Sequence, residues 1–111
     1  MRRLLPYEAR PGRLAVVVED LAQLRGPTGQ VVELPHRLVW QPDRCVDLDQ
    51  PWALRLMYET VLTEAVRVEE LCAWLDGATL VREWGDLFLP RGVRRAWEER
   101  HPVLREVRAA A

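Results

Sequence analysis

Few side chains of this protein belong to the types that perform nucleophilic or metal-dependent catalysis. There are two cysteines, Cys45 and Cys72, two histidines, His36 and His101, and no serine. A nucleophilic triad needs a Ser, Cys or Thr beside a histidine, and both histidines lie next to a proline, in a predicted turn and at a predicted helix end. The cysteines form no CxxC pair, so we expect buried or partly buried apolar side chains, not a disulfide or metal ligands. The sequence therefore predicts no catalytic residue, no metal and no cofactor.

Three carboxylates, Asp43, Asp47 and Asp49, are close together in the sequence. An EF-hand calcium loop needs oxygens at fixed offsets, a central glycine and a closing glutamate, and this pattern is not met. Asp43 falls in a predicted turn at 41–44, and Asp49 stands where the N-cap of a helix beginning at Pro51 belongs. Structural roles are therefore expected for these side chains.

Two motifs were tested for nucleotide or DNA binding. The glycine-containing turn at 25–29 lacks the Gly-Lys-Ser/Thr ending of a phosphate loop and precedes a predicted strand. Ala73 and Gly77 have the A-x-x-x-G spacing of a helix-turn-helix, with 79–86 as the recognition helix. That helix carries one arginine and two acids, which opposes contact with phosphates. Because of the helix-turn-helix spacing, a DNA-binding transcriptional regulator is an alternative function, but the charge of this helix does not favour it.

The charges are divided unevenly along the chain. All 16 basic residues are arginine; residues 1–48 hold seven against six acids, 49–89 three against eight, and 90–111 six against three, which gives +1, −5 and +3. Arg and Trp are common at binding hot spots, so the basic C-terminal segment is the predicted partner contact. Its candidate residues are Arg91, Arg94, Arg95, Trp97, Arg100, Arg105 and Arg108. The other interpretation is a solvated helical face, because three glutamates offset half of the charge.

The partner of this segment is either an acidic protein surface or a phosphate backbone, and salt dependence separates the two. A homodimer that matches the acidic middle of one copy to the basic segment of another is a further possibility. The double change Arg94→Glu/Arg95→Glu is expected to abolish the contact and to leave the melting temperature nearly unchanged.

The elements that position these residues divide into two halves. Before residue 49, the pattern predicts an arm at 1–12 and strands at 14–18, 30–34 and 37–40. Turns are expected at 25–29 and 41–44. The turn at 25–29 is expected to join the first two strands into a hairpin, with Pro35 at an edge or a bulge.

After residue 49, apolar spacing and prolines predict helices. The first begins at Pro51 and buries one face; the others are expected at 68–75, 79–84 or 79–87, 92–100 and 103–108. The face of the first helix is formed by Leu54, Met57, Tyr58, Val61, Leu62 and Ala65. The expected core anchors are Trp52, Trp74, Trp84 and Trp97.

Length and composition agree with one α+β domain of 111 residues, in which a small antiparallel hairpin or sheet in the N-terminal half packs against three to five short helices. We expect an arm at 1–12, a β-rich part at 13–48 and a helical part at 49–108. The hydrophobic fraction is 49%, and no apolar run is long enough to cross a bilayer. With no apolar region behind the first arginines to indicate a signal peptide, a cytoplasmic protein without membrane contact is expected.

Four segments carry a resemblance to other proteins: GQVVELPHRLVW at 29–40, DLD at 47–49, MYETVL at 57–62 and LPRGVRRAWE at 89–98. Together they resemble short uncharacterised proteins of GC-rich actinobacteria, of a kind that we associate loosely with toxin–antitoxin-type gene pairs. The resemblance implies no activity and no site residue. The expected function is a non-enzymatic protein-interaction module, such as an antitoxin or accessory subunit; the alternatives are the DNA-binding regulator and a small-ligand-binding protein or enzyme.

Overall fold

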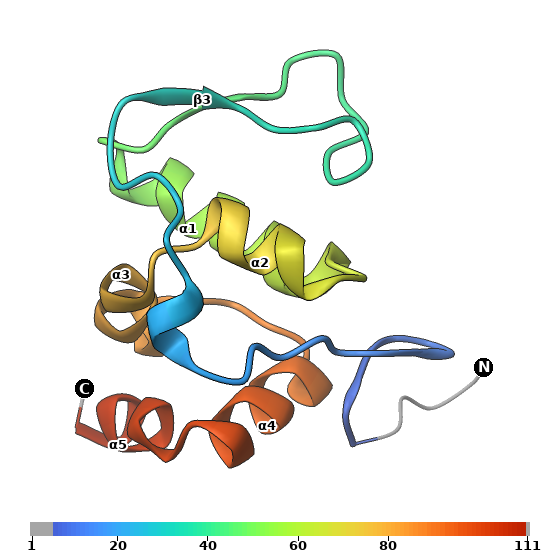
Figure 1. Ribbon diagram of the computed structural model, residues 1–111, viewed down its shortest axis with the longest axis vertical. Helices are drawn as coiled ribbons and strands as arrows, with labels where there is room; N and C mark the ends of the chain where they lie inside the picture. Colours follow the sequence, from blue (N-terminus) through green and yellow to red (C-terminus); the bar gives the residue numbers. More distant parts are fainter. Residues whose placement is uncertain (1–5, 111) are drawn as a thin grey trace.

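The computed structural model describes residues 6–110, which form short strands, five α-helices and two turns of 3-10 helix (Figure 1). In chain order the elements are β1 (Glu8–Arg10), β2 (Arg13–Leu14), η1 (Leu21–Gln23), β3 (Val31–Glu33), β4 (Cys45–Asp47), α1 (Pro51–Glu64), α2 (Val68–Trp74), α3 (Gly77–Glu83), η2 (Trp84–Asp86), α4 (Arg91–Arg100) and α5 (Pro102–Ala110).

The predicted α+β class is confirmed, with 50% of the residues in helices and 12% in strands. Two separate two-stranded antiparallel sheets, β1–β2 and β3–β4, accompany the helices. In Figure 1, β3 lies at one end of the molecule and α4 and α5 lie at the other, with α1, α2 and α3 between them. Among the described residues, no helix is both long and apolar enough to cross a bilayer.

The predicted hairpin around 25–29 is wrong. β3 pairs with β4, with Val32 opposite Val46, and not with the 14–18 segment. The 25–29 segment is attached to the helical half: the Arg25 amide donates to the Cys72 carbonyl (3.2 Å), and the Gly26 amide donates to the Leu75 carbonyl (2.8 Å). An added Cβ at Gly26 would lie 2.4 Å from the backbone of Trp74, so this contact requires glycine.

Two other predicted strands are shorter than expected or missing. Of the apolar run at 14–18, only Leu14 belongs to a strand. The Ala15 amide donates to the Tyr7 carbonyl (2.8 Å), and the chain then continues outside any strand to the fully buried Val18. Residues 37–40 form no strand, because the amides of Leu38 and Val39 both donate to the Pro35 carbonyl and close a turn. A branched apolar sequence alone does not make a strand where no neighbouring strand is in reach.

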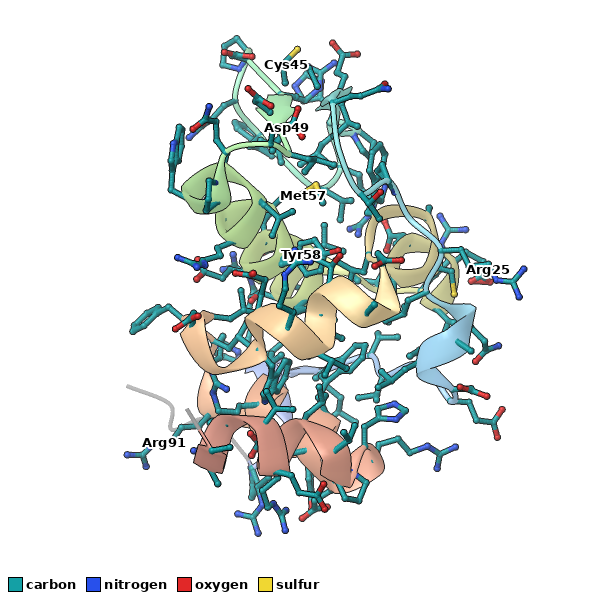
Figure 2. The ribbon with its side chains drawn as sticks, turned by 90° about the vertical axis from the view of Figure 1, so that its left-hand side faces the viewer. Arg25, Cys45, Asp49, Met57, Tyr58 and Arg91 are labelled. Carbon is teal, nitrogen blue, oxygen red and sulfur yellow. The ribbon has the colours of Figure 1, made fainter. Side chains whose placement is uncertain are left out.

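Helix α1 is placed as predicted, but its cap is not. Pro51 occupies the first turn, where its missing N–H costs nothing, and the N-cap is Gln50 without a side-chain bond, not Asp49. The buried face of α1 contains Ala53, Leu54, Met57, Tyr58, Val61 and Leu62, and Ala65 follows at the C-cap. Figure 2 shows Met57 and Tyr58 pointing from α1 into the interior.

The later helices begin at residues that satisfy or remove free backbone amides. The Asp76 carboxylate accepts from the Thr79 amide (3.0 Å) and from the Thr79 hydroxyl (2.8 Å) at the start of α3. Pro90 caps α4, and Pro102 begins α5 directly after the His101 cap of α4. The four predicted helices after α1 are therefore present, with ends that differ by a few residues.

Two tryptophans form the centre of the core. Trp84 and Trp97 are fully buried, with ring centroids 6.4 Å apart, in the tilted arrangement that aromatic pairs prefer. Trp74 is partly buried against the same cluster. The expectation for Trp52 is wrong: the side chain is 69% exposed, because its position on α1 is off the buried face.

The described part of the N-terminal arm is docked on α4. The Gly92 backbone packs so closely on Glu8 of β1 that an added Cβ would lie 2.0 Å from the Glu8 carbonyl oxygen and 2.5 Å from its nitrogen. On the other side, the Arg10 and Arg13 side chains both pair with Glu64 at the end of α1. The arm therefore joins α1 to α4.

We expect Gly92→Ala to lower the free energy of unfolding by about 1–3 kcal/mol, because backbone atoms of β1 must move to admit the methyl group. Denaturant unfolding measures this loss, and hydrogen exchange should show faster exchange of amides in residues 6–14. If stability and exchange are both unchanged, β1 does not pack on Gly92.

Candidate functional site

The structure does not bring the cysteines and histidines into one site. Cys72 is partly buried against the core, as expected, but Cys45 is exposed on β4, which corrects that part of the prediction. His36 is exposed, whereas His101 is buried with Nε2 2.8 Å from the Val18 carbonyl oxygen. Within residues 6–110, no group of three or more His, Cys, Asp or Glu side chains is placed to hold a metal ion.

Two of the three clustered carboxylates accept hydrogen bonds from backbone amides close by in the sequence. Asp43 accepts from the Cys45 amide (3.1 Å), and Asp47 accepts from the Asp49 amide (3.0 Å). Short side chains that bond to the backbone two residues on stabilise turns, and this is their role here. Figure 2 shows Asp49 and Cys45 together at the β3 end of the molecule.

Helices α2 and α3 are joined by a short connection, at the position of the predicted helix-turn-helix. The single arginine of α3, Arg82, pairs with Glu83, and Glu83 is also bonded to Arg55 of α1 (2.7 Å). Thr79 and Leu80 of α3 are buried. This helix therefore presents no basic face that would fit the phosphates of a major groove.

The basic C-terminal segment is divided between the core and the surface. Trp97 is 0% exposed, so it is a core residue and not a surface contact. Arg94 donates to the carbonyls of Trp84 and Leu87 and stacks over the Trp84 ring, and Arg108 is bonded to the buried Glu98 (2.5 Å). Reversing the charge of Arg94 would break these contacts, so Arg94→Glu/Arg95→Glu is expected to lower the melting temperature and not to leave it unchanged.

Five arginines of the predicted set are exposed. Arg108 is one of them but is bonded to Glu98; we call the other four the basic surface: Arg91, Arg95, Arg100 and Arg105. Arg95 contacts Glu99 (3.6 Å) and the Tyr7 ring, and Arg100 contacts Glu19 (3.3 Å). Arg91 and Arg105 have no ion-pair partner among residues 6–110. Figure 2 shows Arg91 pointing away from the ribbon near the α4–α5 end.

An open hollow lies elsewhere, between α1 and the segment that runs from β3 to β4. It has a volume of about 830 Å³ and is open to solvent along one side. Three large apolar side chains in its lining are exposed: Trp40 at 91%, Trp52 at 69% and Leu56 at 56%. We call this hollow, with these three side chains, the aromatic groove.

The walls of the aromatic groove have different origins. Trp52, Leu56 and Thr60 recur every four residues on α1, so they form one stripe along that helix. Trp40 belongs to the opposite wall, in the loop that follows the turn closed on Pro35. Below the stripe, Ala53 and Met57 are buried and form the floor.

Charged side chains around the aromatic groove are of both signs and mostly paired. The lining contains three arginines and four carboxylates: Arg10, Arg37, Arg44, Asp43, Asp47, Glu59 and Glu64. Arg10 pairs with Glu64, and Arg37 pairs with Glu70 of α2 (2.5 Å). Burial raises the pKa of Glu64, but the hydrogen bonds from Arg10 and Arg13 outweigh it and hold this pKa below the ordinary value. The groove is therefore close to neutral and has an apolar centre.

The sequence patterns described above do not predict this groove, although one signal for it is present. Trp52 and Leu56 are four residues apart on α1 but do not share the face of Leu54 and Met57, which indicates a second apolar stripe. The position of Trp40 could not be anticipated, because 37–40 was expected to be a strand.

No protein-family model, no curated protein and no solved structure matches this chain. The surfaces of the chain itself are therefore the basis for its proposed function.

Proposed function

We propose that this chain is a small protein-interaction module whose main contact surface is the aromatic groove. The observation that carries the proposal is the exposure of Trp40, Trp52 and Leu56 around one open hollow. Monomeric proteins rarely expose contiguous apolar patches unless they serve binding. Tryptophan is also the side chain most enriched at the hot spots of protein interfaces.

The form of the groove favours a protein over a small ligand. Small-molecule sites enclose most of the ligand within their walls, whereas Trp40 and Trp52 stand largely in solvent beside an open hollow. Covering apolar surface contributes roughly 25 cal/mol per Å², so a partner that covers both indoles gains several kcal/mol. We further propose that the module is an antitoxin or accessory subunit and not an enzyme.

The basic surface is a second contact in this proposal. Its exposed arginines are available for bidentate pairing with carboxylates of a partner protein. It lies on α4 and α5, at the end of the molecule opposite β3 (Figure 1). The two surfaces are thus separate and can be tested independently.

Co-expression with the product of the co-transcribed neighbouring gene tests the proposal. We expect that product to co-purify with the wild-type chain and to be lost from the Trp40→Ser variant, because removing a hot-spot indole weakens binding at least about 30-fold. The matched control is Phe88→Ser, since Phe88 is 87% exposed but does not line the groove. Equal recovery with both variants would contradict a partner contact at the groove.

The same assay tests the basic surface through Arg91→Glu/Arg105→Glu, in which neither residue has an internal ion pair to lose among the described residues. We expect this double variant to lose the partner while its melting temperature stays within a few degrees of the wild type. A shift of promoter DNA by the wild-type chain, abolished by this variant and steeply weakened by salt, would instead support the DNA-binding alternative.

A further inference from the structure

We infer that the aromatic groove is filled by a second copy of this chain, in a two-fold symmetric dimer in which Trp40 of each copy enters the groove of the other. This inference rests on the proposed function, because it names the protein that covers the same surface. Three observations support it: the shape of the surface, its charge and its area.

The shape is complementary to itself. A two-fold interface brings the same patch of both copies together, so the patch must contain a projection and a hollow that accept each other. Trp40 is the projection, since its side chain is 91% exposed, and the hollow lies directly beside it. The indole of one copy can then pack on Trp52 and Leu56 of the other, and the reverse contact follows from the symmetry.

The charge also fits a second copy better than a strongly charged partner. The groove is lined by three arginines and four carboxylates, and Arg10 and Arg37 already have internal partners. A polybasic or acidic partner would find no net potential to match. A second copy brings the same mixture of signs, so the two apolar centres can meet without strong net repulsion between the grooves.

The exposed aromatic area is large enough to form the centre of a dimer interface. At up to about 250 Å² for each tryptophan, the exposed fractions of Trp40 and Trp52 amount to roughly 400 Å². A standard interface covers roughly 800 Å² on each partner. The two indoles would supply half of this, and the surrounding loop and the exposed part of α1 the remainder.

Such a dimer leaves the basic surface free. The groove lies at the β3 end of the molecule, and α4 and α5 lie at the opposite end (Figure 1). A two-fold axis through the grooves therefore directs the two basic surfaces outward. The dimer presents both basic surfaces to the co-expressed partner, so Trp40→Ser reduces recovery of that partner by removing the second contact.

Sedimentation equilibrium of the full chain from 1 to 500 μM, with a reducing agent because Cys45 is exposed, tests the inference. We expect a wild-type dimer with a dissociation constant of about 1–100 μM. Trp40→Ser should raise that constant about 1000-fold, since a 30-fold hot-spot loss occurs twice in a symmetric interface. Phe88→Ser should change it less than about threefold.

Two measurements make the test specific. Because the proposed contact is apolar, raising NaCl from 0.05 to 0.5 M should change the dissociation constant little, whereas a dimer between the acidic middle and the basic segment should dissociate. With 5-fluorotryptophan, the signals of Trp40 and Trp52 should shift with concentration, and those of the buried Trp84 and Trp97 should not. Unchanged melting temperatures of the variants exclude unfolding as the cause.

A monomeric wild-type chain at 500 μM overturns the inference, as does a Trp40→Ser variant that dimerises like the wild type. If the chain is monomeric but Trp40→Ser still loses its co-expressed partner, the groove binds a different protein, and the proposed function stands without the dimer. If the chain dimerises through the groove while Trp40→Ser keeps the co-expressed partner, the groove belongs to the second copy alone. If neither binding event depends on Trp40, both proposals fail.

Discussion

Replacing Trp97 by alanine is expected to lower the free energy of unfolding by about 3–5 kcal/mol, the usual cost of removing a large aromatic side chain from a core. The Trp97 side chain is fully buried. Its ring centroid lies 6.4 Å from that of Trp84 and 5.8 Å from that of His101. Its removal leaves a cavity between α4, η2 and the cap of α4, which the fixed backbone cannot close completely. Urea or guanidinium unfolding measures the loss.

A matched control for this variant is Trp40→Ala, in which the same side chain is removed from a solvent-exposed position. Measured at a concentration where the chain is monomeric, this change should alter the free energy of unfolding by less than about 0.5 kcal/mol. Equal losses in the two variants would contradict the placement of Trp97 in the core. Phenylalanine at position 97 should recover part of the loss, because it fills part of the cavity.

The second large effect is expected at Glu98, an ion-paired carboxylate whose side chain is only 5% exposed. One of its oxygens accepts from Trp84 Nε1 (2.9 Å) and from Arg108 Nε (2.5 Å), the other accepts from Arg108 Nη2 (2.8 Å), and Arg94 lies 3.9 Å away. Breaking a buried ion pair on one side costs about 3–5 kcal/mol. We expect about 3 kcal/mol for Glu98→Ala, because Arg108 is half exposed and regains water.

Two variants separate the contributions of Glu98. Glu98→Gln keeps one acceptor for Trp84 Nε1 and Arg108 Nε but loses the charge and the acceptor for Arg108 Nη2, so we expect a smaller loss than for alanine, about 1–2 kcal/mol. Glu106→Gln removes an exposed carboxylate of α5 and should change stability by less than about 0.5 kcal/mol. An alanine variant as stable as the wild type would show that Glu98 does not hold Trp84 and Arg108.

The contribution of Glu98 should depend on pH in one direction. The hydrogen bond from Arg108 is the main cause that holds the pKa of Glu98 below its ordinary value, against the opposing effect of burial. Because the folded state has the lower pKa, the stabilisation is complete above the ordinary glutamate pKa of about 4.3 and is lost as the pH falls through the folded value. The difference in stability between wild type and Glu98→Gln should therefore shrink below about pH 4.

The helical half of the fold is determined largely by local sequence. The helix start predicted at Pro51 is confirmed, because proline lacks the amide that a first helical turn leaves free. Pro90 and Pro102 are the predicted helix breaks: Pro90 is the N-cap of α4, and Pro102 is the first residue of α5. The spacing of Leu54, Met57 and Val61 determines the buried face of α1, since residues three and four apart share one side of a helix. These features need no information from distant parts of the chain.

The strand pairing was decided by the tertiary structure. β3 pairs with β4, and the segment expected to turn the chain from 14–18 into β3 is instead bonded to the end of α2 through the amides of Arg25 and Gly26. The approach of Gly26 to Trp74 joins segments almost fifty residues apart. Strand propensity cannot predict such a contact, because it depends on the residue types of the local segment alone.

The same distinction between local sequence and tertiary structure applies to the surfaces. Composition alone identified a basic C-terminal segment, but whether an arginine serves the core or the solvent depends on what packs against α4: Arg94 bonds to η2, while Arg91 faces outward. The five tryptophans are chemically identical in the sequence, and only the packing makes Trp97 a core residue and Trp40 an exposed one. The sequence by itself determined which residues are apolar or charged and where the helices begin; the packing of the arm, the loops and the helices decided which of them water, or a partner, can reach.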